Sequence, residues 1–471
     1  MLLSALTVLA SAGLSAAATQ RRATTSAWTS TDNGSHKLSS YDAPVLGGGN
    51  PGLDNWEFTI KESQRKQEVK GFGAAVTDGT VTAFNQLPAN VRDELLRDIM
   101  GPNGLNFNLM RHTIASSDLS APPAYTYEDN QGGFYLGDRG YAMTSMLAEM
   151  RRLQPNMTLM GAPWAPPAWM QLDRKLTGGT DRNNLDHAYE KEFADYFVKY
   201  LQEYEKQGAH VDYISIQNEP FNSKAQMPTM YIYEDESAAL IRDHVGPAIR
   251  NAGLNTKVWA LDHNTNMYSY AQKVVQQNPG TVSAAAWHCY SGNDGPNWQP
   301  LTRFHNEFPN TEQYMTECWT ALSATNWEHT SNFNMFPLQN WANGIIAWAL
   351  GSYHQGGPAL PGNEPCGICT GLVTIDANAG TYHKEVDYYM MGQFSRFIPK
   401  GAHVVEETGS YIFPDNTGLL SVATVNPDNS RTVVIQNRYD HDIFAMVHTE
   451  REGQPWSARV PGKSTTTWTL P

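Results

Sequence analysis

Two glutamates end strand-like runs of similar character. Glu219 follows Ile214-Ser215-Ile216-Gln217-Asn218, and Glu317 follows Gln313-Tyr314-Met315-Thr316. In α/β folds, side chains at the carboxyl ends of strands carry the chemistry. Two carboxylates facing each other there are what glycoside hydrolysis requires, because one protonates the leaving oxygen while the other attacks the anomeric carbon or activates water. The alternative is a pair of unrelated surface glutamates at turns.

The residues around the two glutamates favour different roles for them. Asn218 can hydrogen-bond a substrate hydroxyl next to Glu219, as suits a residue that orients the sugar. His288 and Tyr290 share one face of a strand end and can donate hydrogen bonds to Glu317. Such donors keep the pKa of a nucleophile low, whereas the pKa of the acid must be raised. As an alternative, His288 and Tyr290 are core residues with satisfied hydrogen bonds.

Further polar and aromatic residues end other predicted strands. They are Asp78, Arg111, Trp164, Asp262, His263 and Trp348. Arg111 lies in a short apolar strand, where its charge is costly unless it is paired. We expect its partner to be an active-site carboxylate, with a structural salt bridge as the alternative. Trp164 and Trp348 are suited to stack on sugar rings, whereas packing in the core or in a loop is as good an explanation for Trp319.

Eight strand-like runs alternate with helical stretches in the middle of the chain. The runs are 71–76, 106–114, 157–164, 211–217, 258–261, 282–290, 313–317 and 344–350. The clearest helices are 186–207 and 234–251, the second with an expected kink at Gly246-Pro247. This rhythm predicts an α/β fold, a (β/α)8 TIM barrel over residues 69–396. An open doubly wound sheet is the alternative, but Gly71-Phe72-Gly73 lacks the third glycine of a phosphate-binding loop.

The pattern changes on both sides of the barrel. Short strands are expected at 411–413, 419–425, 432–436, 443–447 and 465–470, and one strand is expected near residue 58. Residues 41–68 and 397–471 are therefore predicted to form a side β-sandwich from the N- and C-terminal segments. Residues 19–40 are predicted to be an N-terminal tail or pro-segment.

The first residues read as an export signal. Leu2 to Leu14 is apolar, and Ala16-Ala17-Ala18 supplies small residues for cleavage, so residues 1–18 are predicted to be a signal peptide. The run is shorter than the roughly 20 residues that a membrane anchor needs. We therefore expect a secreted, extracellular protein, with glycosylation candidates at Asn33 and Asn156. A net charge of −14 argues against nucleic acid as a partner.

The four cysteines allow three pairings. Cys366 and Cys369 lie in a loop rich in glycine and proline and are the disulfide candidate, because a zinc site would want two more ligands. Cys289 and Cys318 end the sixth and seventh strands and are either a second pair or buried thiols. The sequence carries no metal or cofactor signature.

Taken together, these motifs resemble glycoside hydrolase family thirty from about residue 70 to residue 399. The matching motifs include Gly71-Phe72-Gly73, Ser116-Ser117-Asp118, Ala162-Pro163-Trp164, Asn218-Glu219-Pro220, His288-Cys289-Tyr290 and Thr316-Glu317-Cys318. The resemblance implies a (β/α)8 barrel with a side sandwich and a retaining mechanism. It also implies that Glu219 is the acid/base and Glu317 the nucleophile. Asp118, Trp164, Asn218 and Trp348 match substrate-contacting positions, and Arg111, His288 and Tyr290 match the supporting residues.

Within this family the chain looks most like the fungal endo-β-1,6-glucanases, which implies a β-glucan polysaccharide or oligosaccharide as partner. Xylanase, galactanase and glucosylceramidase activities are the alternatives from the same family. Where the glucosylceramidases have a Trp, this chain has Cys289. A non-catalytic carbohydrate-binding barrel is the alternative of another class, and the presence of both acids argues against it. We expect a monomer.

Overall fold

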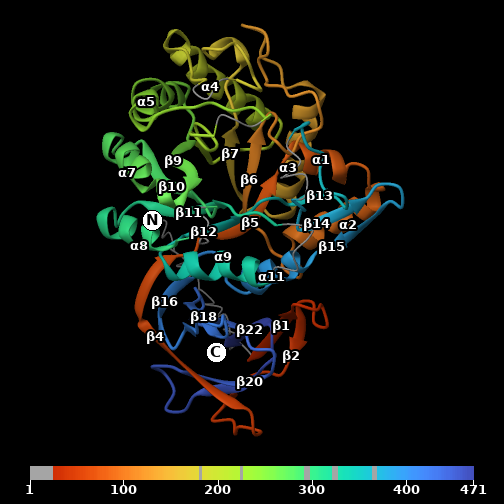
Figure 1. Cartoon of the computed structure of the whole chain (residues 1–471), viewed down its shortest axis with the longest axis vertical. Helices are drawn as coiled ribbons and strands as arrows, with labels where there is room; N and C mark the ends of the chain where they lie inside the picture. Colours follow the sequence, from red (N-terminus) through yellow and green to blue (C-terminus); the bar gives the residue numbers. More distant parts are fainter. Residues whose placement is uncertain (1–24, 180–182, 223–225, 291–296, 321–326, 363–368) are drawn as a thin grey trace, which may run out of the picture.

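A computed structural model describes residues 25–179, 183–222, 226–290, 297–320, 327–362 and 369–471. Two units lie one above the other in Figure 1, a barrel with its helices and a domain made of strands. The predicted signal peptide, residues 1–18, lies outside the described residues. None of the helices in these ranges combines the length and the apolar character that crossing a bilayer needs.

Eight parallel strands close into a barrel in the order β10-β11-β12-β5-β6-β7-β8-β9. Their bounds are Gly71–Val76 (β5), Leu109–Ile114 (β6), Thr158–Pro163 (β7), Tyr213–Ser215 (β8), Lys257–Asn264 (β9), Val282–His288 (β10), Glu312–Glu317 (β11) and Gly344–Ala347 (β12). Every residue of β5 and β6 is buried, as expected for parallel strands covered on both faces. The predicted (β/α)8 barrel is confirmed, since each predicted run overlaps one of these strands.

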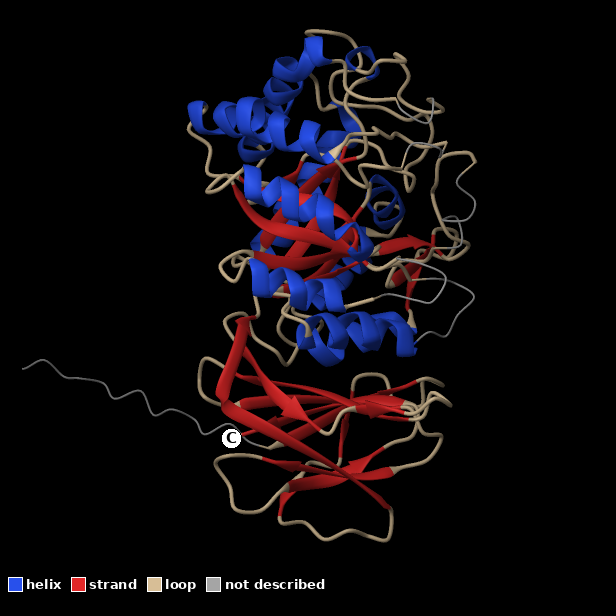
Figure 2. Ribbon diagram, turned by 60° about the vertical axis from the view of Figure 1, so that its left-hand side comes forward, coloured by secondary structure: helices blue, strands red, loops and turns tan. Residues whose placement is uncertain are grey.

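Helices surround the barrel (Figure 2). They are α1 (Asp78–Phe84), α2 (Ala89–Met100), α3 (Gly137–Leu153), α4 (Glu190–Lys206), α5 (Glu234–Leu240), α6 (Gly246–Asn251), α7 (Tyr268–Gln277), α8 (Gln299–Glu307), α9 (Trp327–Gln339) and α11 (Val386–Ser395). The helix predicted over 234–251 is interrupted earlier than expected. A π-helical turn, η3 (Ile241–Val245), separates α5 from α6 and ends before Pro247, which has no N–H to donate.

The second domain is one long sheet folded over itself. Its strand order is β2-β1-β22-β19-β18-β16-β4-β20-β21-β3, with β17 beside β18. The bounds are Ser26–Thr31 (β1), Ser39–Tyr41 (β2), Val45–Leu46 (β3), Asp54–Glu68 (β4), His403–Thr408 (β16), Tyr411–Ile412 (β17), Gly418–Val425 (β18), Arg431–Asn437 (β19), Ile443–His448 (β20), Trp456–Val460 (β21) and Ser464–Leu470 (β22). The first half of β4 pairs with β20 and the second half with β16, so β4 joins the two layers seen in Figure 2.

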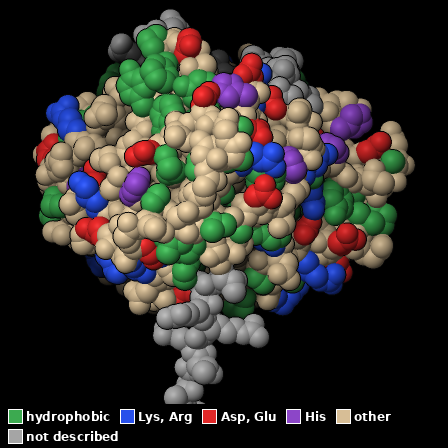
Figure 3. Space-filling model, turned by 90° about the horizontal axis from the view of Figure 1, so that it is seen from below, with side chains coloured by type: hydrophobic (Ala, Val, Ile, Leu, Met, Phe, Trp, Pro, Cys, Tyr) green, Lys and Arg blue, Asp and Glu red, His purple; other side chains and the backbone are tan. Residues whose placement is uncertain are grey.

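A separate apolar core fills this domain. Phe58, Val433, Val447, Trp456 and Trp468 come from both layers and are buried against one another. The domain therefore has the form of a sandwich built from both ends of the chain. Seen from its end, Lys and Arg side chains are interspersed with Asp and Glu (Figure 3).

The prediction that residues 19–40 form a tail is wrong from Ser26 onward, because β1 and β2 belong to the sheet. The run 26–31 is rich in hydroxyl residues, a composition that predicts a tail. In the sheet these hydroxyls are partnered across strands: Thr29 Oγ1 lies 2.7 Å from Thr466 Oγ1, and Ser26 Oγ lies 2.7 Å from Thr469 Oγ1. Pairing with β22 on one side and with β2 on the other makes the segment a strand.

Five further strands were not predicted from the sequence. β16 and β21 complete the sheet domain, and a small sheet of β13 (Gly351–Tyr353), β14 (Val373–Asp376) and β15 (Thr381–Lys384) follows the last barrel strand. Helix α11 then packs against β1 and β22 at the junction of the two units. There the side-chain amide of Gln393 lies 2.7 Å from Thr467 Oγ1.

Asp387 in α11 is a buried acid far from the barrel mouth, and it makes stability depend on pH. Burial raises the pKa of Asp387 from its ordinary value of 3.8 to about 7, although the Thr330 hydroxyl donates a hydrogen bond to the carboxylate. A raised pKa means that the folded state binds the proton more tightly, so this contribution to stability is present below pH 3.8 and is lost as the pH rises through about 7. The loss is about 1.4 kcal/mol per pH unit within that window.

We therefore expect Asp387→Asn to unfold at higher urea concentration than the wild type at pH 8. The difference should shrink toward zero near pH 4, where Asp387 is already protonated. Urea unfolding of both proteins at pH 4, 6 and 8 measures this. The same difference at all three pH values would contradict the assignment.

Candidate active site

Arg111 in β6 lies at the centre of a buried ionic network. Its side chain is fully buried, and its guanidinium donates to Glu317 Oε2 at 2.6 Å, to Asn218 Oδ1 at 2.6 Å and to Asp262 Oδ2 at 3.0 Å. The expectation that Arg111 pairs with a carboxylate at the barrel mouth is confirmed. The guanidinium of Arg111 thus links β6 to the ends of three other strands, since its partners lie at the ends of β8, β9 and β11.

Glu219 lies four residues beyond the end of β8. The backbone N–H of Asn218 donates to the carbonyl of Pro163, the last residue of β7, and that of Glu219 donates to the Asp262 carbonyl in β9. Glu219 itself adopts a left-handed conformation, with φ of 48°. A non-glycine residue adopts this conformation at a cost, so the two backbone bonds to neighbouring strands hold the turn in place.

The carboxylates of Glu219 and Glu317 meet at His288. Its Nδ1 lies 3.2 Å from Glu219 Oε1 and 3.8 Å from Glu317 Oε1. The two carboxylate oxygens are therefore no more than about 7 Å apart, the sum of these distances, which includes the 5–5.5 Å typical of retaining glycosidases. His288 pairs with Glu317 in the register of β10 and β11, which explains why they are adjacent.

Tyr290 and His288 differ in what they contact. The Tyr290 hydroxyl donates to Glu317 Oε1 at 3.0 Å, as predicted. His288 instead makes its hydrogen bonds to Glu219 Oε1 and, through Nε2 at 3.1 Å, to Asp262 Oδ1. The hydrogen bond that His288 was predicted to donate to Glu317 is not made, since Nδ1 lies 3.8 Å from Glu317 Oε1. Asp262, the partner of Nε2, lies in an irregular part of β9 where the backbone is left-handed, and strand periodicity does not predict this irregularity.

The pKa directions in the free protein are opposite to the predicted ones. Burial raises the pKa of Glu317, and the charges of His288 and Arg111 oppose it. Burial also acts to raise the pKa of Glu219, but the hydrogen bond from His288 and the nearby His263 outweigh it and lower the pKa to about 2. Although burial opposes it, the attraction of Glu317, Asp262 and Glu219 raises the pKa of His288 to about 9.

These shifts place one proton within the pair formed by Glu219 and His288. The raised pKa of His288 and the lowered pKa of Glu219 favour the proton on His288, whose Nδ1 lies 3.2 Å from Glu219 Oε1. A neutral His288 beside a protonated Glu219 carries the same total charge as an imidazolium beside a carboxylate. The proton that an acid catalyst needs is thus one hydrogen bond away from Glu219.

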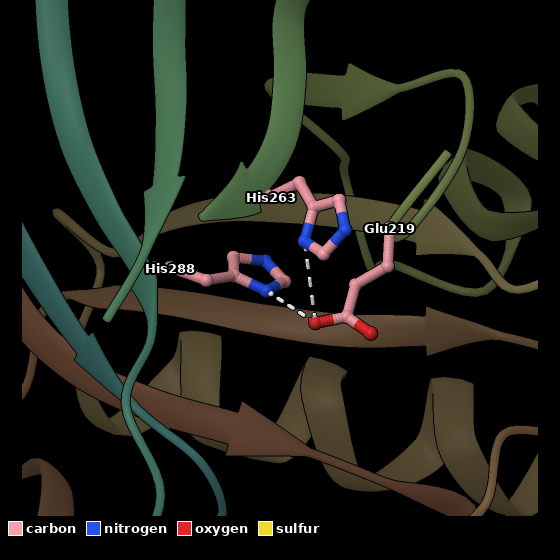
Figure 4. Close-up of side chains that lie close together, drawn as sticks. All are labelled: Glu219, His263 and His288. Carbon is pink, nitrogen blue, oxygen red and sulfur yellow. Dashed lines mark hydrogen bonds and ion pairs between the residues drawn. The ribbon is translucent and has the colours of Figure 1, made fainter. Parts of the chain in front are cut away.

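Asp262 and His263 reach the site, although the sequence shows them only as polar residues at a strand end. Alternation along a regular strand would turn their side chains to opposite faces. Leu261 and Asp262 have φ of 73° and 64°, and the pairing of β9 with β10 shifts register at this point. Both side chains therefore reach the site: Asp262 contacts Arg111 and His288, and His263 Nδ1 lies 3.5 Å from Glu219 Oε1 (Figure 4).

Aromatic rings lie directly above the ionic network. Trp164 and Trp348 stack with centroids 5.2 Å apart, and the Arg111 guanidinium lies 5.1 and 5.6 Å from their rings. Trp319 is half-buried beside them, bridged to Trp348 through the backbone and in ring contact with His329 at 5.4 Å. The structure thus brings the three predicted tryptophans to the same mouth as Glu219 and Glu317.

Comparison with known proteins agrees with this geometry. Residues 69–398 match the Glycosyl hydrolase family 30 TIM-barrel domain. The chain belongs to glycosyl hydrolase family 30. The family-30 chain is 54% identical to an endo-1,6-β-D-glucanase from Neurospora crassa, over 99% of this chain and 98% of that protein. It is 50% identical to an endo-1,6-β-D-glucanase from Aspergillus fumigatus, over 97% of each chain.

The family-30 fold also agrees with solved structures. The structure of the endo-β1,6-glucanase BT3312 superimposes with a TM-score of 0.84 at 26% identity, covering 95% of this chain and 99% of that one. This coverage includes the sheet domain as well as the barrel. The protein is therefore a glycoside hydrolase whose two units are both shared with this relative.

Asp78 and Asp118 follow β5 and β6 of the family-30 barrel. Both oxygens of Asp78 accept hydrogen bonds from the Arg139 guanidinium, and the Tyr125 hydroxyl donates to one of them. Among the described residues, Asp78 thus joins the loop after β6 to α3, which is a supporting contact. Asp118 is buried, and its carbonyl accepts from the Leu360 N–H in the segment after β12.

The structure decides between the two alternatives for Cys289 and Cys318 in this family-30 chain, a second pair or buried thiols. Cys289 and Cys318 are joined by a disulfide with Cα atoms 5.4 Å apart, because β10 and β11 are adjacent in the barrel. Cys366 lies outside the described residues, so the bridge from Cys366 to Cys369 stays a prediction. The side chains of Asn33 and Asn156 are exposed, and glycosylation there also stays a prediction.

We expect peptide mapping without reduction to recover one peptide containing Cys289 linked to one containing Cys318. The bridge closes a loop with a sequence separation of 29 residues. Replacing both with serine should therefore lower the free energy of unfolding by about 3–4 kcal/mol, as measured in urea. Recovery of both cysteines as free thiols would contradict the bridge.

Proposed function

We propose that this protein is a retaining endo-β-1,6-glucanase that hydrolyses β-1,6-glucan, with Glu219 as acid/base and Glu317 as nucleophile. The observation that supports β-1,6-glucan as the substrate is sequence identity. About half of all residues, over nearly the whole chain, are identical to those of two proteins named endo-1,6-β-D-glucanase. The observation that supports the mechanism is the meeting of two carboxylates at His288.

In the first step Glu317 attacks the anomeric carbon while Glu219 protonates the leaving glycosidic oxygen. Arg111 and Tyr290 each donate a hydrogen bond to one oxygen of Glu317. These two hydrogen bonds fix the orientation of the carboxylate at the end of β11. When the substrate binds, its glycosidic oxygen lies next to Glu219. The proton then passes from His288 to Glu219 and from Glu219 to the leaving oxygen. The carbon–oxygen bond to the aglycone breaks, and a glycosyl ester with Glu317 forms.

In the second step water enters opposite the ester and Glu219 removes its proton. The oxygen of this water bonds to the anomeric carbon, and the carboxylate of Glu317 leaves. Glu219 and His288 again share one proton, so the site returns to its starting state. Two displacements on one carbon retain the β configuration.

Reducing-sugar release from pustulan, xylan and glucosylceramide, assayed side by side, tests the specificity. We expect hydrolysis of pustulan with release of oligosaccharides, and rates on the other two substrates at least about 100-fold lower. A higher rate on xylan or glucosylceramide would assign the protein to a sibling specificity. Binding to pustulan without hydrolysis would favour a carbohydrate-binding barrel.

We further propose that the protein acts outside the cell as a monomer. The apolar run before Ala16-Ala17-Ala18 supports export, and the exposed Asn33 and Asn156 are accessible acceptors for glycans. Amino-terminal sequencing of protein from culture medium, together with light scattering, tests both statements. Retention of the intact amino terminus inside the cell would contradict export.

A further inference from the structure

Three potential metal ligands converge on one side of the site. Glu219 Oε1, His263 Nδ1 and His288 Nδ1 all lie within 4.8 Å of one another (Figure 4). The carboxylate oxygen lies 3.5 Å from His263 Nδ1 and 3.2 Å from His288 Nδ1. Ligands bound at 2.0–2.1 Å in a tetrahedral zinc site are about 3.3–3.4 Å apart, so the two spacings from the carboxylate oxygen to the histidine nitrogens match that geometry.

His263 supplies an independent sign that a ligand belongs there. Its Nδ1 is buried and makes no hydrogen bond within the described residues, although it points toward Glu219. A buried nitrogen lone pair or N–H without a partner is costly. A metal ion between His263, His288 and Glu219 would satisfy this atom.

The surroundings of His288 match those of a metal-bound histidine. Its Nε2 lies 3.1 Å from Asp262 Oδ1, so the opposite nitrogen, Nδ1, is aimed into the cluster. Metal-binding histidines commonly use their second nitrogen for such a carboxylate, which orients the ring. In addition, the three carboxylates of Glu219, Asp262 and Glu317 outnumber the two cations, the Arg111 guanidinium and the His288 imidazolium, and the excess negative charge attracts a cation.

We infer that Glu219, His263 and His288 form an inhibitory site for zinc or a divalent cation of similar ligand preference. Two imidazoles and one carboxylate are a donor set that zinc accepts, with the fourth position left for water. A bound ion occupies the oxygen of Glu219 that faces His288, so Glu219 can neither give nor take a proton. The cation would therefore block hydrolysis reversibly, an inference whose inhibitory part rests on the proposed function.

Zinc binding is measured first, without reference to activity. The full-length protein is freed of metals by dialysis against EDTA and then competes with a chromophoric chelator for zinc chloride. We expect the wild type to take up one zinc ion that His263→Ala binds at least about tenfold more weakly. His383→Ala, which removes an exposed histidine of β15, is the matched control and should bind zinc as the wild type does.

Hydrolysis is measured second, with the same zinc concentrations. Activity of the wild type should fall with the dissociation constant found by competition, return on addition of EDTA, and remain unaffected by magnesium chloride. If His263→Ala does not fold, as judged by thermal unfolding, His263→Asn replaces it, since an amide keeps a polar group but is a poor zinc ligand. Three results would overturn the inference. They are no zinc uptake by the wild type, uptake by the His263 variant that equals that of the wild type, and uptake without loss of activity.

A failure of the proposed function gives a different pattern of results. Zinc uptake that depends on His263, in a protein that hydrolyses none of the three glycosides, would leave the metal site standing and refute the enzymatic proposal. Hydrolysis of pustulan that zinc does not inhibit would support the enzymatic proposal and refute the inhibitory metal site.

Discussion

Glu317→Gln is expected to lower kcat on pustulan by about 10⁴-fold or more, because a glutamine amide cannot attack the anomeric carbon. Glutamine has nearly the size of glutamate, and its carbonyl oxygen can still accept from Arg111 or Tyr290. The variant should therefore fold and still bind oligosaccharide, which thermal unfolding and calorimetric titration measure. Full turnover by this variant would refute the assignment of two catalytic carboxylates.

A matched control lies on the same strand. Glu312 begins β11 at the opposite end of the barrel and forms an ion pair with Lys70 at 3.5 Å. Glu312→Gln should leave kcat unchanged, since the residue is remote from the mouth. A comparable loss in both variants would point to damage of the strand and not to chemistry.

Azide separates the roles of the two glutamates. With an activated aryl β-glycoside, Glu317→Ala should accept azide at the anomeric carbon and release an α-glycosyl azide. Glu219→Ala keeps the nucleophile, so its glycosyl ester should be trapped as the β-glycosyl azide. The reverse pair of products would exchange the roles that we propose, and this test matters because the pKa directions of the free protein do not assign them.

Arg111→Met is expected to lower the free energy of unfolding by about 3–5 kcal/mol. The substitution leaves Asp262 and Glu317 buried without their cation, and removing one member of a buried ion network costs more than the network contributes when complete. Urea unfolding, followed by tryptophan fluorescence, measures the change. The same variant should lose activity, because Glu317 is no longer held by Arg111.

Arg242→Met provides the control for this experiment. Arg242 forms an ion pair with Asp243 at 2.6 Å, but both side chains are about half exposed. Solvent-exposed pairs contribute about 0–1 kcal/mol, so this variant should remain close to the wild type. Equal losses in the two variants would contradict the view that burial makes the Arg111 network essential.

Several features of this protein could be predicted from local sequence alone. The barrel follows from eight short apolar runs, because strands buried on both faces need apolar residues throughout. Glu219 and Glu317 stand out because each ends such a run, and a parallel barrel turns all strand ends to one face. The partner of Arg111 could also be anticipated, since a charge within an apolar strand requires a counterion.

Other features depend on the surroundings of a residue in space. β1 was taken for a tail because its hydroxyl residues become partnered only beside β22. The bridge between Cys289 and Cys318 requires that β10 and β11 be neighbours, whereas nearness in sequence favoured Cys366 and Cys369.

The sequence by itself thus determined the fold class and the two carboxylates, since both are written in runs of a few residues. Only the tertiary structure decided where the proton lies and which side chains surround it. Two left-handed residues in β9 turn Asp262 and His263 toward His288, and strand periodicity cannot anticipate such a turn. The resulting contacts join residues far apart in the chain, and their burial and mutual charge set the pKa values of Glu219 and His288.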